Sequence, residues 1–272
     1  LAYQYDVPIV VRGGGSGTTG GAQAVEGCVV ISVENLNRII EIDTANRVAV
    51  CECGVITGEL QRAVERQNLF YPPDPGSLEV CTIGGNVAEN AGGPRCLKYG
   101  VTGHYVLGLD GFYPDGTPFS FGGKHYKNVS GYSLKDLLVG SEGTLAVVTR
   151  VYLKLLPKPK VEMSLLLGFH SFDDALSVLD SIRLLSEMPS ALEFFDDTCA
   201  KAAQNFVQEH RFPNDIKAFL IVSFDGMHES EIHQRVDLLV DKNKDKLTYH
   251  WIPKSKQDAA YLWKVRRAIS PG

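Results

Sequence analysis

Near the start of the chain, the residues suited to chemistry are six glycines among the nine residues from Gly13 to Gly21. They follow an apolar run that ends in Val11 and Arg12. Backbone without side chains can approach a ligand closely, and convergent N–H groups of a glycine-rich turn bind phosphate oxygens. Arg12 adds a fixed positive charge suited to phosphate. The segment alone predicts a diphosphate site or a tight structural turn, with equal weight.

Two familiar nucleotide motifs fit this loop poorly. No Gly-Lys-Ser/Thr follows it, which argues against a P-loop. Gly13, Gly15 and Thr18 approximate the dinucleotide fingerprint GxGxxG only if Thr replaces the last glycine, and no helical pattern follows.

Two further segments favour the diphosphate site over the tight structural turn. The stretch from Tyr71 to Gly103 is 33 residues of mainly turn-forming and small residues, a length that compact domains keep mostly for binding. Its Asn86 and Asn90 can supply amide hydrogen bonds. A third segment, GSEGTLAVV at residues 140–148, adds a turn and the carboxylate of Glu142, which can accept from a ribose or a ring N–H. Three separated segments of this kind predict an extended dinucleotide.

The secondary structure expected to position these segments differs between the two parts of the chain. Up to Leu156–Lys160, which is typical of a linker, we expect a buried strand at 7–11, short strands and turns, and a helix at 56–69 capped by Thr57. A hairpin turn is expected at Pro114–Gly116. Beyond the linker, strands alternate with helices, which favours an open α/β layer. Strands are expected at 161–170, 218–226 and 246–253, and helices at 171–187, 230–245 and 256–269, the last stopping at Pro271–Gly272.

Composition excludes several classes. Of 272 residues, 44% are apolar, and no run of about 18 apolar residues occurs, so we expect no transmembrane segment. The net charge of −5 with scattered Lys and Arg argues against nucleic acid as a partner. Six cysteines without a CxxC pair and histidines without HxxxH or HxH spacing predict reduced thiols and no metal site. We expect a cytoplasmic protein, with a peripheral membrane position as the alternative.

Three ordered blocks carry a family resemblance. PIVVRGGGSGTTGG, the tract from YPPDPGS through TIGGNVAENAGGPRCLKYGVTG to FYPDG, and LVGSEGTLAVVTRVYLKLLPKP resemble the FAD-binding domain of the vanillyl-alcohol oxidase superfamily. Within it they are most similar to the D-lactate dehydrogenase and glycolate oxidase FAD-subunit branch. The resemblance implies an α+β fold: a two-subdomain PCMH-type FAD-binding domain over residues 1–157, then part of an α/β, ferredoxin-like cap domain over residues 161–272.

The resemblance also implies which residues contact FAD. The backbone of the first loop would hold the pyrophosphate, and the other two segments would supply further contacts. These residues are Arg12, Gly13, Gly14, Gly15, Ser16, Gly17, Thr18, Pro73, Asp74, Thr82, Gly84, Gly85, Asn86, Ala88, Gly92, Tyr99, Glu142, Gly143 and Val148. Some relatives attach flavin covalently through a His at the position of Ser16, so here we expect non-covalent FAD.

The reaction that the resemblance implies is oxidation of a small 2-hydroxy acid, glycolate or D-lactate, by hydride transfer to flavin N5. Arg266, in a Trp-x-x-Arg pattern with Trp263, would clamp the substrate carboxylate; otherwise it is an ordinary cation near a helix end. Lys98 and Tyr99 are second candidates at the flavin or substrate edge. His104 is a further candidate, as a base or a neighbour of the flavin.

The chain also departs from the family. It lacks Met at its start, and it stops before the family's histidine-rich C-terminal motifs, which supply the base and, in some relatives, a metal. We therefore expect a fragment. Electrons would pass to a quinone, an electron-transfer flavoprotein or an iron–sulfur subunit. Two alternatives stay open: a non-catalytic FAD-binding or electron-relay subunit of a glycolate oxidase-type complex and, less favoured, a flavin reductase acting on a UDP-sugar.

Overall fold

The computed structural model describes residues 1–269, which form two compact units. The first consists of Leu1–Gly93 and Gly100–Lys158, and the second of Pro94–Tyr99 and Pro159 onward. Nothing in the sequence pattern indicated that the short segment Pro94–Tyr99 belongs with the second unit. No helix among the described residues is long and apolar enough to cross a membrane.

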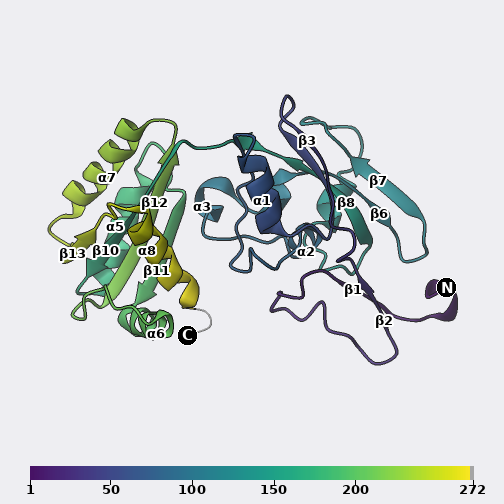
Figure 1. The fold of residues 1–272 in the computed structure, drawn as a ribbon, viewed down its shortest axis with the longest axis horizontal. Coiled ribbons are helices and arrows are strands. Elements are labelled where there is room, and N and C mark those ends of the chain that lie inside the picture. The colour runs from purple at the N-terminus through teal and green to yellow at the C-terminus, as the bar shows by residue number, and fades with distance from the viewer. Residues whose placement is uncertain (270–272) are drawn as a thin grey trace. The chain divides into compact units, whose positions relative to one another are not determined.

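A five-stranded antiparallel sheet in the order β3-β4-β8-β6-β7 is the centre of the first unit (Figure 1). Its strands are β3 (Ile39–Asp43), β4 (Val48–Glu52), β6 (Val106–Phe112), β7 (Pro118–Gly122) and β8 (Val147–Lys154). All five residues of β4 are buried. Strands β6 and β7 form the hairpin predicted at Pro114–Gly116, so that prediction is confirmed.

Smaller elements of this unit surround the glycine-rich segments. Strands β1 (Ile9–Arg12) and β2 (Val29–Ser32) pair in parallel, and β5 (Leu69–Phe70) pairs with β9 (Leu156–Pro157). The helices are η1 (Tyr3–Tyr5), α1 (Thr57–Glu65), α2 (Ile83–Glu89), η2 (Thr102–Tyr105) and α4 (Leu134–Leu138).

Four expectations for this unit need correction. Strand β1 is half-exposed rather than buried, because its described sheet has only two strands. Thr57 does not cap α1: its hydroxyl donates to the Cys81 carbonyl instead. The expected linker begins with β9, which is paired. The second glycine-rich tract is not wholly irregular, since it contains α2, whose N-cap Thr82 accepts from the Gly85 N–H.

An antiparallel sheet in the order β11-β12-β10-β13 forms the second unit, with helices on both faces. Its strands are β10 (Val161–Phe169), β11 (Ala191–Asp196), β12 (Ala218–Gly226) and β13 (Tyr249–Trp251). Its helices are α3 (Cys96–Tyr99), α5 (Phe172–Arg183), α6 (Asp197–Val207), α7 (Glu229–Asn243) and α8 (Lys256–Ala268). The predicted stop of the last helix at Pro271–Gly272 lies outside the described residues.

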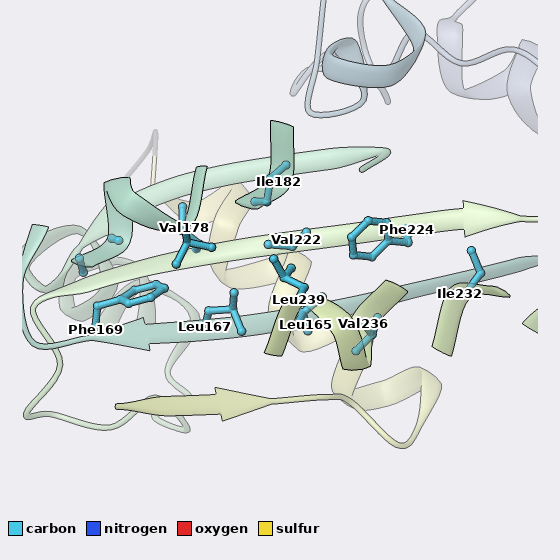
Figure 2. Packing of buried hydrophobic residues seen from close by; sticks show 13 residues of the cluster. Leu165, Leu167, Phe169, Val178, Ile182, Val222, Phe224, Ile232, Val236 and Leu239 are labelled. Carbon is cyan, nitrogen blue, oxygen red and sulfur yellow. The ribbon is translucent and has the colours of Figure 1, made fainter. Parts of the chain in front are cut away.

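Alternation along the two central strands explains the layers of this unit. Leu165 and Leu167 of β10 and Val222 of β12 point toward α5 and α7, as Figure 2 shows. Leu166 and Ile221, one position along, face α6 and α8. Because both faces are covered there, residues 165–169 of β10 and 218–222 of β12 are unbroken runs without a polar side chain. The helix predicted to open at Ser171 is confirmed, since Ser171 Oγ accepts from the Asp174 N–H at 3.1 Å.

This architecture, two main antiparallel sheets with helices packed against them, agrees with the predicted α+β fold class. Sequence analysis missed β11 and α6, although Asp196 carries a helix-start signal: its carboxylate accepts from the Cys199 N–H at 2.7 Å.

Candidate functional site

The first glycine loop leaves β1 at Arg12 and packs directly on the second tract. A Cβ on Gly13 would lie 2.4 Å from Thr82 Oγ1, and one on Gly14 would lie 2.2 Å from the Val80 carbonyl oxygen. Real Cβ atoms do not approach other atoms so closely. These two glycines are therefore required for contact between protein segments, whatever the loop binds.

The second tract is held just as closely from beneath. A Cβ on Gly84 would lie 2.7 Å from Cys53 Cβ, so α2 can rest on the end of β4 only without a side chain there. The Asn86 side chain is 2% exposed, and its Nδ2 donates to Thr57 Oγ1 at 2.7 Å. Asn90 Oδ1 accepts from the Gly103 N–H. One atom of each amide is thus engaged by the protein, while Asn86 also lines the cleft described below.

The third segment docks on α2 through its backbone. The Gly140 N–H donates to the Val87 carbonyl at 2.9 Å, and the Glu142 N–H donates to the Ala88 carbonyl at 2.8 Å. Glu142 has φ of 53°, a left-handed conformation that is uncommon for a residue with a side chain. The backbone hydrogen bonds to α2 hold this strained residue in place.

Together the three segments line one cleft of about 270 Å³ in the first unit. Ser16 Oγ in the first loop donates to Ser77 Oγ in the second tract at 3.1 Å. Of the residues expected to contact a cofactor, those that line the cleft are Gly13, Gly14, Gly15, Ser16, Gly17, Thr18, Thr82, Gly84, Gly85, Asn86, Ala88, Glu142, Gly143 and Val148.

The cleft is suited to a large, flat or extended molecule that carries phosphate. Its lining includes eight glycines and four alanines, which let a ligand approach the main chain. The Arg12 guanidinium lies beside Gly15, with Nη2 only 2.6 Å from where a Cβ would be. A fixed cation next to glycine backbone matches a diphosphate group. The residues present therefore fit an FAD-like dinucleotide.

Cys53 also lines the cleft, but its chemistry there is inert. Burial raises the pKa of its thiol to about 12, so the thiol stays protonated at neutral pH. No disulfide joins any of the six cysteines, all of which lie within residues 1–269. Cys53 acts as a small apolar wall residue.

Several expected site residues lie away from this cleft lining. The Pro73 carbonyl accepts from Gln61 Nε2 at 2.8 Å, and the Asp74 carboxylate lies against Gly93. Gly92 is in the segment without regular structure that follows α2. His104 is exposed in η2, where its ring packs on Gly100.

Lys98 and Tyr99, also outside the cleft, bind Asp225 within the second unit. Lys98 Nζ donates to Asp225 Oδ1 at 2.6 Å, and Tyr99 Oη donates to Oδ2 at 2.7 Å. The Asp225 carboxylate is 4% exposed. A buried carboxylate with two donors is a strong anchor, and here it fixes α3 on the end of β12.

Arg266 projects from α8 to the neighbouring strand β11. Its Nε donates to Glu193 Oε2 at 2.6 Å, and Nη2 donates to the same oxygen. One turn earlier, Trp263 Nε1 donates to Ser164 Oγ at 3.0 Å. The pattern Trp-x-x-Arg thus places both side chains on the sheet face that α8 covers.

Sequence reasoning missed part of the cleft lining. Thr19, Ser77 and Glu89 lie inside the quoted motifs, so their position was a usable signal. Val33 and Cys53 come from a loop and a strand end whose composition is unremarkable for a binding site. Only the tertiary fold brings these residues to the cleft.

Comparison with known families covers most of the chain. Residues 1–122 match the family described as FAD binding domain, and residues 158–272 match the family described as FAD linked oxidases, C-terminal domain.

Several relatives of known name are similar over much of the chain. The glycolate oxidase subunit GlcD of Bacillus subtilis is 42% identical over 85% of this chain and 49% of its own length. The D-lactate dehydrogenase of Archaeoglobus fulgidus is 40% identical over 85% of this chain and 52% of its own. The D-2-hydroxyglutarate dehydrogenase of Stutzerimonas stutzeri is 31% identical over 99% of this chain and 58% of its own length. The chain thus spans about half the length of these relatives.

Solved structures support the same fold. An alkyldihydroxyacetonephosphate synthase superposes with a TM-score of 0.77 at 22% identity, covering 99% of this chain and 51% of the other. A p-cresol methylhydroxylase with substrate bound gives a TM-score of 0.77 at 16% identity, covering 97% and 57%.

Proposed function

Because the chain belongs to the superfamily of FAD-linked oxidases, we propose that it is part of an enzyme that oxidises glycolate or D-lactate to the 2-oxo acid. Bound FAD would supply the acceptor for the hydride that leaves C2 of the acid.

The observation that carries the cofactor assignment is the meeting of three glycine-rich segments in one cleft of the first unit. The backbone of Gly13–Thr18 would hold the diphosphate, and Arg12 would neutralise part of its charge. The second and third segments would lie along the rest of the dinucleotide, through Thr82–Ala88 and Glu142–Val148.

The flavin in this proposal is bound without a covalent link. Ser16, at the position where some relatives carry a His, lines the cleft with a hydroxyl that donates to Ser77. A serine hydroxyl cannot form the histidyl–flavin bond. Binding therefore depends on the non-covalent contacts of the cleft.

Arg266 is proposed to bind the substrate carboxylate. Glu193 occupies its Nε and Nη2 edge, and across residues 1–269 its Nη1 has no hydrogen-bond or ion-pair partner. A guanidinium oriented by one carboxylate can present its remaining N–H groups to a second. A 2-hydroxy acid supplies a carboxylate next to the carbon that is oxidised. His104 stays a candidate base or flavin neighbour.

Electrons would then pass to a quinone, an electron-transfer flavoprotein or an iron–sulfur subunit. The second candidate function is an FAD-binding relay subunit of a glycolate oxidase-type complex. The similarity to a glycolate oxidase subunit supports this function as well as the enzyme, because both would use the same FAD cleft.

The experiment that separates these functions is an absorbance scan of the intact protein before and after anaerobic D-lactate, then glycolate. Flavin bands that bleach with one acid support the enzyme and identify its substrate. Flavin bands that bleach with neither favour the relay subunit. A protein without flavin that takes up no added FAD contradicts both.

A further inference from the structure

Glu89 places a carboxylate in the cleft that is proposed to hold FAD. It is the last residue of α2, is half-buried and lines the cleft. The Thr19 hydroxyl lies 3.2 Å from both carboxylate oxygens, and Oε1 would lie 3.4 Å from a Cβ on Gly17. The carboxylate thus faces the far part of the first glycine loop.

No cation balances this carboxylate within residues 1–269, where Glu89 forms no salt bridge and Thr19 is its hydrogen-bond donor. Other carboxylates of this unit do have cations, such as Glu52 with Arg38 and Glu65 with Lys158. An acceptor-only group with one donor has capacity for several more hydrogen bonds.

Charge is therefore distributed unevenly along the loop. The Arg12 guanidinium lies at Gly15, whereas Glu89 lies at Gly17 and Thr19. Within the loop that is proposed to hold the diphosphate, this group is therefore favoured around Gly15, near the cation, and disfavoured from Gly17 onward, near the carboxylate. The part of a dinucleotide that suits a carboxylate is a sugar, whose hydroxyl groups are donors.

We propose that Glu89 accepts hydrogen bonds from neighbouring hydroxyl groups of a sugar portion of the dinucleotide, with Thr19 holding the carboxylate in place. Acidic residues bind ribose hydroxyls in this way in other dinucleotide folds. The proposal rests on the assignment of the cleft to FAD but not on the identity of the hydroxy acid. Ribose and the ribityl chain share this chemistry.

Whether removal of the Glu89 charge weakens or strengthens FAD binding shows whether this carboxylate faces sugar hydroxyls or the diphosphate. If Glu89 faced the diphosphate, neutralising it would strengthen FAD binding. If it accepts from hydroxyls, removing it weakens binding, because each hydrogen bond to a charged acceptor is worth roughly tenfold or more in affinity. Charge repulsion across a solvent-open cleft is screened and is the smaller effect.

The test compares the intact wild-type protein, stripped of flavin, with E89A, E89Q and the control E59Q, which removes an equal charge from the exposed face of α1. FAD affinity is measured by flavin fluorescence, and thermal unfolding checks that each variant is folded. We expect the Kd of FAD to rise roughly tenfold in E89A and less in E89Q, whose amide oxygen still accepts. E59Q should match the wild type.

Titrations with ADP and FMN then identify the sugar. Weaker ADP binding by E89A assigns the ribose, and weaker FMN binding assigns the ribityl chain. If folded E89Q and E89A bind FAD as tightly as the wild type, or more tightly, the role of Glu89 is refuted while the FAD cleft stands. If the wild type itself binds no FAD, the cleft assignment fails and this inference fails with it.

Discussion

The hydroxyl of Ser16 donates a hydrogen bond to the hydroxyl of Ser77 at 3.1 Å, linking the first glycine-rich loop to the second tract. The two residues are 61 positions apart in the chain. Together with the close packing of Gly13 on Thr82, this contact makes the cleft a product of tertiary structure. Cofactor affinity should therefore depend on contacts between segments as well as on direct ligand contacts.

Arg12→Ala should weaken FAD binding roughly tenfold, because it removes a charged hydrogen-bond donor beside the proposed diphosphate position. Titration of the stripped protein with FAD measures the change. Arg66→Ala, at the exposed end of α1, is the matched control and should have no effect. Equal affinity in wild type and Arg12→Ala would remove Arg12 from the phosphate site.

Acid precipitation should release all flavin into the supernatant, because Ser16 provides no histidine for a covalent link. Absorbance of the supernatant and the pellet measures the distribution. A pellet that stays yellow after repeated washing would show a covalent flavin and contradict this prediction.

Arg266→Lys should raise KM for the carboxylate substrate by roughly tenfold or more, since a lysine cannot donate to Glu193 and to a second carboxylate with the same planar geometry. Steady-state kinetics of the intact enzyme measure KM and kcat separately. Arg267→Lys, on the exposed side of α8, is the control. An unchanged KM in Arg266→Lys would make the Glu193–Arg266 pair purely structural.

Gly84→Ala should destabilise the protein by about 1–3 kcal/mol, because the new methyl group overlaps Cys53 in a closely packed region. Denaturant unfolding measures the difference. Gly76→Ala is the control, since no atom lies within 4 Å of its Cβ position. Equal stability of the two variants would mean that α2 can shift away from β4.

Glu52 should contribute stability that depends on pH. Hydrogen bonds from the Arg38 side chain and backbone lower the pKa of the Glu52 carboxyl. The folded state therefore favours the ionised form. Its contribution is present above the ordinary carboxyl pKa and is lost as pH falls through the lowered value. The stability difference between wild type and Glu52→Gln, measured by unfolding at several pH values, should shrink in acid; a constant difference would contradict this.

Local patterns predicted much of this structure. The Pro114–Gly116 hairpin and the Ser171 cap follow from turn and cap chemistry within a few residues. The prediction that Thr57 caps α1 was wrong because its hydroxyl donates to a buried acceptor, the Cys81 carbonyl. Helix α2 was missed because Gly84 and Gly85 weaken helical propensity, whereas packing on Cys53 requires a glycine.

In the candidate site too, local composition predicted some features, whereas tertiary contacts determined the others. Composition indicated the three glycine-rich segments, and the structure brings them to one cleft. Composition could not indicate that Lys98 and Tyr99 would meet Asp225, more than 120 residues later. Such partners are set by the register of β12 and not by any local signal.

The anchoring of α3 by Asp225 has a consequence for recombination between relatives. Residues 94–99 are encoded amid the first unit but belong to the second. A chimera joined once at residue 158 would combine Lys98 and Tyr99 of one parent with the β12 carboxylate of another. Exchange of the second unit between family members should therefore succeed best when residues 94–99 are exchanged together with it, although the two segments are separated in the sequence.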